Sequence, residues 1–325
     1  MTQKIFGAVE IGGTKITAIT AKDLKTIMNK GGFPTISPKE TLHDIIDFFK
    51  STLSEGEFEY QAIGVGSFGP LDLNPESRTY GYITSTPKQG WQFFNIKQEI
   101  ETALQTRVYL ETDVNASALG EFFLYPENKI QNLVYITIGT GIGAGIIING
   151  KIVHGLVHPE FGHIRIPHDF RQDPFPGICP FHRDCFEGLA SGPAMSERWH
   201  MAPEKIPLDH IAWELEAEYI SFAIANLICT ISPEIIVFGG GVMQRHQLLK
   251  MVQMKTRWIL GGYIKSKSLE ENISEYIITP RLKEDSGILG ALSMAIHESK
   301  SKSRKSRQQL CKKIGFKLPF FEVQS

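Results

Sequence analysis

The chain has 325 residues, of which 42% are hydrophobic, and its formal net charge is −1. This length exceeds what a single hydrophobic core usually covers, so we expect two globular domains. The longest mostly apolar stretch, residues 219–231, is too short to span a bilayer. The first residues lack the architecture of a signal peptide, so we expect a cytoplasmic protein with no membrane partner.

The charges are distributed unevenly along the chain. Residues 300–325 hold eight Lys or Arg and one acidic residue, which leaves 26 basic and 34 acidic residues in residues 1–299, a net charge of −8. An acidic body argues against a surface that binds nucleic acid. We expect the basic segment, residues 299–325, to be a disordered tail without a catalytic role.

Two similar β-rich units stand out along the chain. The first, residues 5–20, is hinged at Gly12 and Gly13, and the second, residues 133–148, is hinged at residues 139–143. Their likeness indicates an internal duplication, and the strands that follow alternate with helical patterns, so the sequence predicts an α/β fold. Further strands are expected at residues 62–65, 108–111 and 234–238, and helices at 116–122, 213–231 and 287–297.

Two related halves predict a cleft in which nucleotide and substrate meet. We expect an N-terminal domain over residues 1–115, completed by a helix at 286–298, and a C-terminal domain over residues 116–285. Order is expected to end near residue 298.

The hinge of the first unit is a candidate phosphate loop. At Gly12 and Gly13 the missing side chains let backbone N–H groups approach phosphate oxygens, while Thr14 and Lys15 add a hydroxyl and a positive charge. The alternative is a tight hairpin turn that needs glycine for conformational reasons only. This loop alone does not decide between them.

Two further glycine segments lie at strand ends, at residues 139–143 and 239–241. The first offers another narrow backbone surface with the hydroxyl of Thr140, and the second places bare backbone where a nucleotide can lie close. A hairpin turn and simple flexibility are their alternatives. Three such segments in one chain favour nucleotide binding, and the lack of a Walker motif disfavours the ordinary P-loop fold.

Asp113 is the candidate catalytic base. It follows the strand at 108–111 and precedes a helix, and a carboxylate there can accept the proton of a sugar hydroxyl that attacks a γ-phosphate. The alternative is that Asp113 caps the helix running through residues 116–122.

Four side chains have the spacing of a metal site. Cys179, His182 and Cys185 recur at three-residue intervals, and His163 lies sixteen residues before Cys179. Two thiolates and two imidazoles favour a tetrahedral Zn²⁺ site that is structural, because the protein fills every position. The alternative is a buried pair of cysteines with two surface histidines.

Two carboxylates beside these ligands, Glu160 and Glu187, are candidate acceptors of sugar hydroxyls, although each also suits a solvated surface. The turn that ends in Gly69 and Pro70, and the segment from Thr86 to Trp91, are further candidates for lining a sugar pocket. Trp91 has the core as its alternative.

Over nearly all of residues 4–297 the sequence resembles the ROK family of sugar kinases and regulators, and most closely its bacterial fructokinase branch. The motifs that carry the resemblance are residues 10–15, 66–70, 86–88 with 90–91, 112–115, 139–143, 158–160 with 162–163, 179–193 and 239–241. The chain departs from many relatives in having Glu10 where they have Asp, and His182 where they have Cys. Both features resemble the fructokinase branch.

The resemblance implies an actin-like fold of two domains, ATP and Mg²⁺ as phosphoryl donor and its metal, structural zinc, and conversion of D-fructose to fructose 6-phosphate. It implies that Asp113 is the base, that Glu160 and Glu187 contact the sugar, and that the protein is a homodimer. The residues expected at the nucleotide are Gly12, Gly13, Thr14, Lys15, Thr140, Gly141, Pro193, Gly239, Gly240, Gly241, Val242 and Met243, and those at the sugar are Gly69, Pro70, Thr86, Asp113, Glu160 and Glu187.

Two alternative functions remain. A sugar-responsive transcriptional regulator would need a DNA-binding module in front of the first strand, which begins near residue 4, and the acidic body disfavours it. A kinase for glucose, mannose or an amino sugar keeps the same chemistry, and the sequence separates these sugars poorly.

Overall fold

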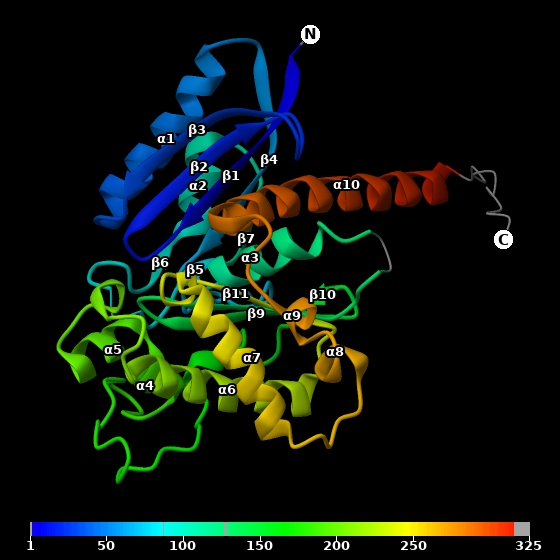
Figure 1. Cartoon of the computed structure of the whole chain (residues 1–325). Coiled ribbons are helices and arrows are strands. Elements are labelled where there is room, and N and C mark those ends of the chain that lie inside the picture. Colours follow the sequence, from blue (N-terminus) through cyan, green and yellow to red (C-terminus); the bar gives the residue numbers. More distant parts are fainter. Residues whose placement is uncertain (1, 87, 127–128, 315–325) are drawn as a thin grey trace, which may run out of the picture.

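The computed structural model describes residues 2–86, 88–126 and 129–314, with side chains up to residue 300. Two five-stranded β-sheets form its two halves (Figure 1). Two helices lie between the sheets, and the remaining helices cover the outer sides of the halves. The α/β class predicted from the sequence is confirmed.

The two sheets have the same topology. In each, three consecutive strands form an antiparallel meander, a fourth strand pairs in parallel with the first strand of the meander, and a fifth pairs in parallel with the fourth. The first sheet has the order β3 (Ile27–Pro34), β2 (Lys15–Ala21), β1 (Gln3–Ile11), β4 (Phe58–Ser67) and β7 (Val108–Thr112). The second has the order β10 (Lys151–Ile152), β9 (Ile142–Ile148), β8 (Leu133–Ile138), β11 (Ile235–Gly239) and β12 (Ile277–Ile278). The internal duplication inferred from the glycine-hinged units is therefore present in the topology.

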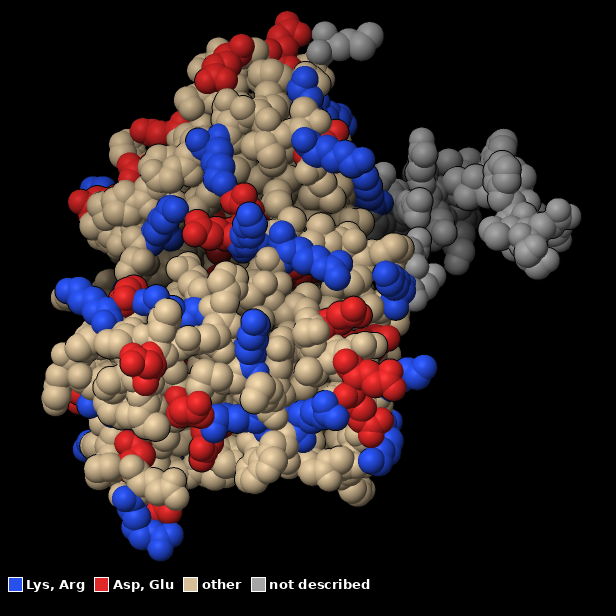
Figure 2. Space-filling view, in the orientation of Figure 1, with Lys and Arg blue, Asp and Glu red and all other residues tan. Residues whose placement is uncertain are grey.

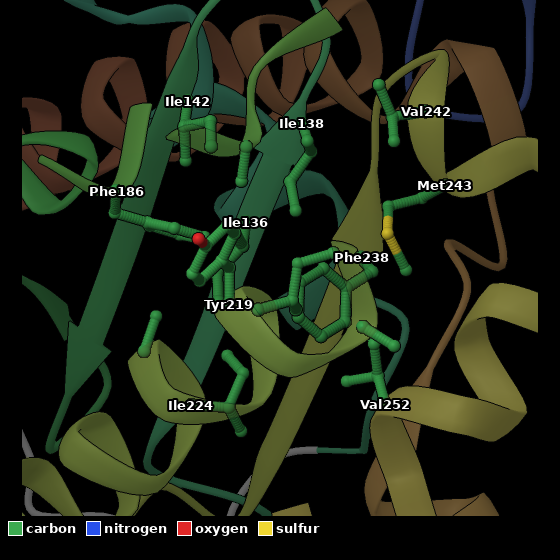
Figure 3. Packing of buried hydrophobic residues seen from close by; sticks show 14 of the residues in the cluster. Ile136, Ile138, Ile142, Phe186, Tyr219, Ile224, Phe238, Val242, Met243 and Val252 are labelled. Atoms are coloured by element: carbon green, nitrogen blue, oxygen red, sulfur yellow. The ribbon is translucent and has the colours of Figure 1, made fainter. Parts of the chain in front are cut away.

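The second sheet consists of short apolar strands, and both of its faces are buried. Along β8, Ile136 and Ile138 enter the core under the outer helices, whereas Tyr135 enters the cluster on the opposite face. Alternation places successive side chains on opposite faces, so a strand buried on both sides reads as a continuous apolar run. Figure 3 shows Ile136 and Phe238 packed against side chains of the outer helices.

The helices on the outer sides bury one apolar face each. On the first half these are α1 (Pro38–Ser54) and α2 (Ile96–Leu104). On the second they are α4 (Phe186–Ala190), α5 (Gly192–Trp199), α6 (Ala212–Ile231), α7 (His246–Leu260), α8 (Lys267–Glu270) and α9 (Ile273–Tyr276). Smaller elements are the strands β5 (Tyr82–Ile83) and β6 (Phe94–Asn95) and the 3₁₀ turns η1 (Phe161–His163), η2 (Pro203–Lys205), η3 (Val242–Gln244) and η4 (Lys283–Asp285).

Helices α3 (Asp113–Phe122) and α10 (Ser286–Ile314) form the layer between the sheets (Figure 1). They cross closely because glycine occurs at the contact on both helices: a Cβ at Gly120 or Gly290 would collide with the backbone of the other helix. The apolar face of α10, which includes Ile288 and Leu292, packs on the first sheet. This layer brings the start of α3 and the start of α10 to the same place between the two halves.

Helix α10 is longer than the sequence predicted. We expected order to end near residue 298, whereas the helix continues to Ile314. Residues 299–314 contain no Gly or Pro and are rich in Lys, Arg and Gln, which are good helix formers. The rest of the expected tail, residues 315–325, lies outside the described residues.

Two further observations concern the helices and the charges on the surface. None of the helices in the described residues is both long and apolar enough to traverse a bilayer. Lys and Arg are interspersed with Asp and Glu over the face seen in Figure 2, without a continuous region of one sign.

Candidate functional site

A cavity of about 610 Å³ lies where the start of α3, the start of α10 and the end of β11 meet. Carboxylates line one part of its wall and bare glycine backbone another. The lining residues are Glu10, Asp113, Val114, Ser117, Tyr135, Thr137, Phe238, Gly239, Gly240, Gly241, Met243, Gln244, His246, Thr279, Pro280, Lys283, Glu284, Ser286 and Gly287. The arrangement suits a ligand that needs close backbone approach beside acidic groups.

Asp113 is the first residue of α3 and faces this cavity. The helix cap is the preceding residue: the Thr112 hydroxyl accepts the backbone N–H of Asn115 at 3.1 Å. The capping alternative for Asp113 is therefore wrong, and its carboxylate accepts the adjacent Val114 N–H at 2.9 Å. Burial raises the pKa of Asp113 to about 6, with a smaller contribution from the negative charge of Glu160. A carboxylate of this kind is ionised at neutral pH and is a stronger base than an ordinary Asp.

Glu10 ends deep in the same cavity, at the start of helix α10. Its pKa is raised to about 7, mainly by burial and further by the charges of Asp113 and Asp285, although the Ile288 N–H at the helix start lowers it. Glycine at position 287 makes this possible, because a Cβ there would collide with the Glu10 carboxylate. Strand β1 and helix α3 thus bring the carboxylates of Glu10 and Asp113 into one cavity.

Two of the three predicted glycine segments, residues 139–143 and 239–241, pack together, and the segment that contains Pro193 packs against residue 139. Gly192 N–H donates to Gly139 O at 2.8 Å, and a Cβ on Gly139 would touch the backbone of Gly241. Gly240 has a φ of +91° and lies against Ile138 O, a position that excludes a Cβ. Of this group, Gly239, Gly240, Gly241 and Met243 line the cavity, whereas Thr140, Gly141, Pro193 and Val242 do not.

The first glycine loop forms a closed hairpin turn, in which Gly12 N–H donates to Lys15 O at 2.9 Å. Gly13, Thr14 and Lys15 are exposed, and the loop lies outside the cavity lining, next to Glu10. The Lys88 ammonium contacts Gly13 O. The loop therefore has the hairpin turn, carries the cation of Lys15, and has that of Lys88 beside it.

The two predicted sugar carboxylates lie in different surroundings. Glu187 accepts the Ile142 N–H at 2.9 Å, and a Cβ on Gly141 would crowd its carboxylate, so Glu187 is tied to the glycine turn of the second sheet. The Glu160 side chain is 45% exposed and lies near enough to Asp113 to raise its pKa. Glu160 is thus the carboxylate associated with the catalytic candidate.

The turn at Gly69 and Pro70 reaches the Glu160 segment through His158. The Leu71 N–H donates to His158 Nε2 at 3.1 Å, and Nδ1 of the same ring is 3.5 Å from Glu160 Oε1. The sequence identified the segment that contains His158 but gave the ring no role. The available signal was its place at the start of the motif at residues 158–160, next to Glu160.

The segment around Thr86 has a buried anchor. Trp91 is fully buried, donates from Nε1 to Ile36 O at 2.9 Å and contacts the ring of Phe68, so its core interpretation is confirmed. Thr86 is buried, and its carbonyl accepts the Gln92 amide at 2.8 Å. The structure gives Thr86 no contact with Asp113 or Glu160.

The four predicted metal ligands come together. Ligand atoms of His163, Cys179, His182 and Cys185 all lie within 4.8 Å of one another. His163 Nδ1 is 3.8 Å from Cys179 Sγ and 3.5 Å from Cys185 Sγ, and His182 Nδ1 is 3.6 Å from Cys179 Sγ. Tetrahedral zinc with ordinary bond lengths requires N to S separations of about 3.6 Å. The residues present therefore fit that ion.

A tight backbone knuckle presents the two thiols. Cys179 and Arg183 exchange backbone hydrogen bonds of 3.2 and 2.9 Å, with Arg183 at a φ of +62°. A Cβ at Gly177 or Gly188 would collide with Arg183 O, so glycine is needed on both sides of the knuckle. Burial raises the pKa of the Cys185 thiol to about 11, which an ion would oppose by favouring the thiolate.

Several cavity residues were absent from the sequence prediction. Tyr135 and Thr137 point inward from β8, and Ser286 and Gly287 form the start of α10. The small pair Ser286 and Gly287 directly before an apolar helix was a usable signal. Tyr135 and Thr137 reach the cavity because β8 lies next to β11, and the order of strands in a sheet cannot be inferred from this sequence alone.

Comparison with known proteins places this geometry in a family. The sequence profile of the ROK family matches residues 6–298. A fructokinase of Lactococcus lactis subsp. cremoris is 43% identical over 291 residues, covering 89% of this chain and 96% of that protein. A fructokinase of Pediococcus pentosaceus is 38% identical, covering 90% of this chain and 97% of that protein. The crystal structure of a ROK hexokinase from Thermus thermophilus superposes with a TM-score of 0.73 at 26% identity, covering 91% and 99% of the two chains.

The fold is thus the actin-like α/β fold of ROK sugar kinases, as the motifs predicted. The chain belongs to the ROK family, and its similarity to fructokinases over nearly their full length places it in the bacterial fructokinase branch.

Proposed function

We propose that the protein transfers the γ-phosphoryl group of ATP to the 6-hydroxyl of D-fructose. The observation that carries the proposal is the similarity to fructokinases over nearly their full length. It is supported by the carboxylate of Asp113, which has a raised pKa and lies in a cavity lined in part by glycine backbone. Phosphoryl transfer depends mostly on positioning and electrostatics, which such a cavity supplies.

Asp113 acts as the general base. Its carboxylate accepts the proton of the attacking hydroxyl, and its pKa of about 6 keeps it ionised while making it a better proton acceptor than an exposed Asp. Glu160 accepts sugar hydroxyls beside it, and the turn of Gly69 and Pro70, with Thr86 further out, borders the sugar. Glu187 accepts a sugar hydroxyl in addition to the Ile142 N–H, since a carboxylate has several acceptor sites.

The nucleotide lies along the glycine segments. Gly239, Gly240, Gly241, Val242 and Met243 flank the base and ribose, and the segments with Thr140, Gly141 and Pro193 pack behind them. Gly12, Gly13, Thr14 and Lys15 reach the phosphates by domain closure. Glu10, whose carboxylate is buried beside Asp113, is the group on this chain suited to hold Mg²⁺ directly or through water, and bound Mg²⁺ neutralises phosphate charge.

Zinc is structural in this proposal. His163, Cys179, His182 and Cys185 fill all four positions, which leaves none for a reacting water. The ion would fix the loop that carries Glu160 on one side and Glu187 on the other. We also propose a cytoplasmic homodimer with domains at residues 1–115 with 286–298 and at residues 116–285, and without nucleic-acid or membrane partners.

A coupled assay of ADP release tests the function. Purified protein is supplied with ATP and Mg²⁺ and with fructose, glucose, mannose, glucosamine or N-acetylmannosamine. We expect the highest kcat/KM with fructose and fructose 6-phosphate as its product. A higher value with another hexose changes the substrate and keeps the kinase, whereas no turnover with any sugar refutes the kinase proposal.

A further inference from the structure

The buried ring of His158 joins two parts of the site that come from different halves of the chain. On one side it accepts the Leu71 N–H at Nε2, 3.1 Å away, and on the other its Nδ1 is 3.5 Å from Glu160 Oε1. The side chain is only 7% exposed. The ring therefore connects the turn at Gly69 and Pro70 with the carboxylate of Glu160, the proposed acceptor of sugar hydroxyls.

The hydrogen bond to Leu71 determines where the ring proton resides. A neutral imidazole has one N–H and one acceptor nitrogen, and Nε2 is occupied as the acceptor of an amide. The proton is then on Nδ1, the nitrogen that faces Glu160. Leu71 itself is held firmly, because it pairs with Ile83 of β5 and Pro70 O accepts the Thr84 N–H at 2.8 Å.

Glu160 needs such a donor to stay in place. Its side chain is 45% exposed, and the charges of Glu160 and Asp113 repel each other, which favours turning the carboxylate away towards solvent. Within the described part of the chain, this carboxylate accepts no hydrogen bond, and the His158 ring, 3.5 Å away, is its ion-pair partner.

We propose that His158 is a positioning residue, which holds Glu160 in the orientation that accepts the sugar hydroxyls and so sets affinity for the sugar. The inference rests on the proposed sugar kinase function. Since His158 is linked to Glu160 and to the Leu71 turn, its loss weakens the sugar interaction and leaves the nucleotide segments unchanged.

Two substitutions separate the two contacts of the ring, the hydrogen bond from Leu71 and the contact with Glu160. In His158→Asn the side-chain amide reaches about as far as Nδ1 and can still donate to Glu160, whereas in His158→Gln it reaches about as far as Nε2 and can still accept from Leu71. We expect His158→Gln to raise the KM for fructose about tenfold, the worth of one hydrogen bond to a charged group, with the KM for ATP unchanged. His158→Asn should retain most of the affinity for fructose, and His43→Gln on the exposed side of α1 is the matched control.

A double-mutant cycle tests whether His158 acts through Glu160. In a Glu160→Gln background, His158→Gln should add little further increase in the KM for fructose, because the group it positions is already altered. Additive effects, or equal KM values for the Asn and Gln variants, overturn the inference. Thermal melting of each variant identifies any general loss of stability.

A measurement without substrate keeps this inference separate from the proposed function. The ring nitrogen chemical shifts of His158, read by NMR in protein labelled with ¹⁵N-histidine, should report the tautomer protonated at Nδ1. A ring protonated at Nε2 overturns the inference even if the protein phosphorylates fructose. Failure to phosphorylate any hexose instead refutes the proposed function, and the tautomer then still tests the hydrogen-bond arrangement.

Discussion

The carboxylate of Glu10, on the first strand of the chain, shares a cavity with the carboxylate of Asp113 at the start of α3. Their mutual charge contributes to the raised pKa of Glu10, which is about 7, while that of Asp113 is about 6. Both pKa values are raised above those of exposed carboxyls, which is typical of functional sites. Asp113, with a pKa of about 6, is mostly ionised at neutral pH and suits the role of base, and Glu10 suits a group whose charge depends on a cation.

The pH profile of the reaction should reflect both groups. Asp113 must be ionised to accept a proton, so we expect kcat to fall as the pH is lowered through about 6. Mg²⁺ near Glu10 favours its charged form, so at low Mg²⁺ a second loss of activity should begin near pH 7, and saturating Mg²⁺ should move it to lower pH. Profiles at two Mg²⁺ concentrations that coincide would remove Glu10 from metal binding.

Asp113→Asn should lower kcat by about 10² or more, because the variant keeps the shape of the side chain and loses the base. The KM for fructose and the melting temperature should change little, since Thr112 rather than Asp113 caps α3. Asp47→Asn, on the exposed surface of α1, is the control. A variant with wild-type turnover would show that another group accepts the proton.

The histidine and cysteine cluster should contain zinc. Protein purified without chelator should hold about one equivalent per chain, and less than about half an equivalent would count against the site. Cys185→Ser should abolish the bound metal and lower the melting temperature, whereas Cys229→Ser should do neither, because Cys229 is an exposed free thiol outside the cluster. Retention of metal by Cys185→Ser would place the ion elsewhere.

Some of this architecture could be read from the sequence because its cause is local. Strand ends at glycine hinges were predicted closely: β8 and β9 span Leu133–Ile138 and Ile142–Ile148, within the expected residues 133–148. Cys179, His182 and Cys185 likewise lie close together because a single tight turn of the backbone contains them. These features depend on neighbours in the chain.

Other features depend on distant contacts and could not be predicted. The Ser, Lys and Arg composition after residue 298 predicts disorder, but those residues also permit a helix, and α10 continues to Ile314. Glu187 accepts the Ile142 N–H, and Glu10 lies against the start of α10. Both contacts join segments that are far apart in the sequence. The cap of α3 is Thr112, one position before Asp113. Sequence patterns locate the end of a helix only to within one or two residues, so they could not distinguish the two.

A buried carboxyl away from the site provides a test of the second core. Glu216 on α6 is almost completely buried, and among the described residues its carboxyl oxygens have no hydrogen-bond partner. Burial raises its pKa well above the usual value, although the charge of Arg198 lowers it in part. The folded protein therefore binds a proton at Glu216 that the unfolded chain releases at lower pH.

The sign of the pH effect follows from that difference. A carboxyl with a raised pKa in the folded state favours folding fully below its unfolded pKa, and this stability is lost as the pH rises towards the folded pKa, by about 1.4 kcal/mol per pH unit. Glu216→Gln resembles the protonated carboxyl and cannot ionise, so its melting temperature should match wild type near pH 4 and exceed it increasingly towards pH 8. Glu214→Gln, exposed on the same helix, should show no such divergence. A constant difference between Glu216→Gln and wild type across this range would mean that Glu216 is ionised in the folded protein, paired with the guanidinium of Arg198.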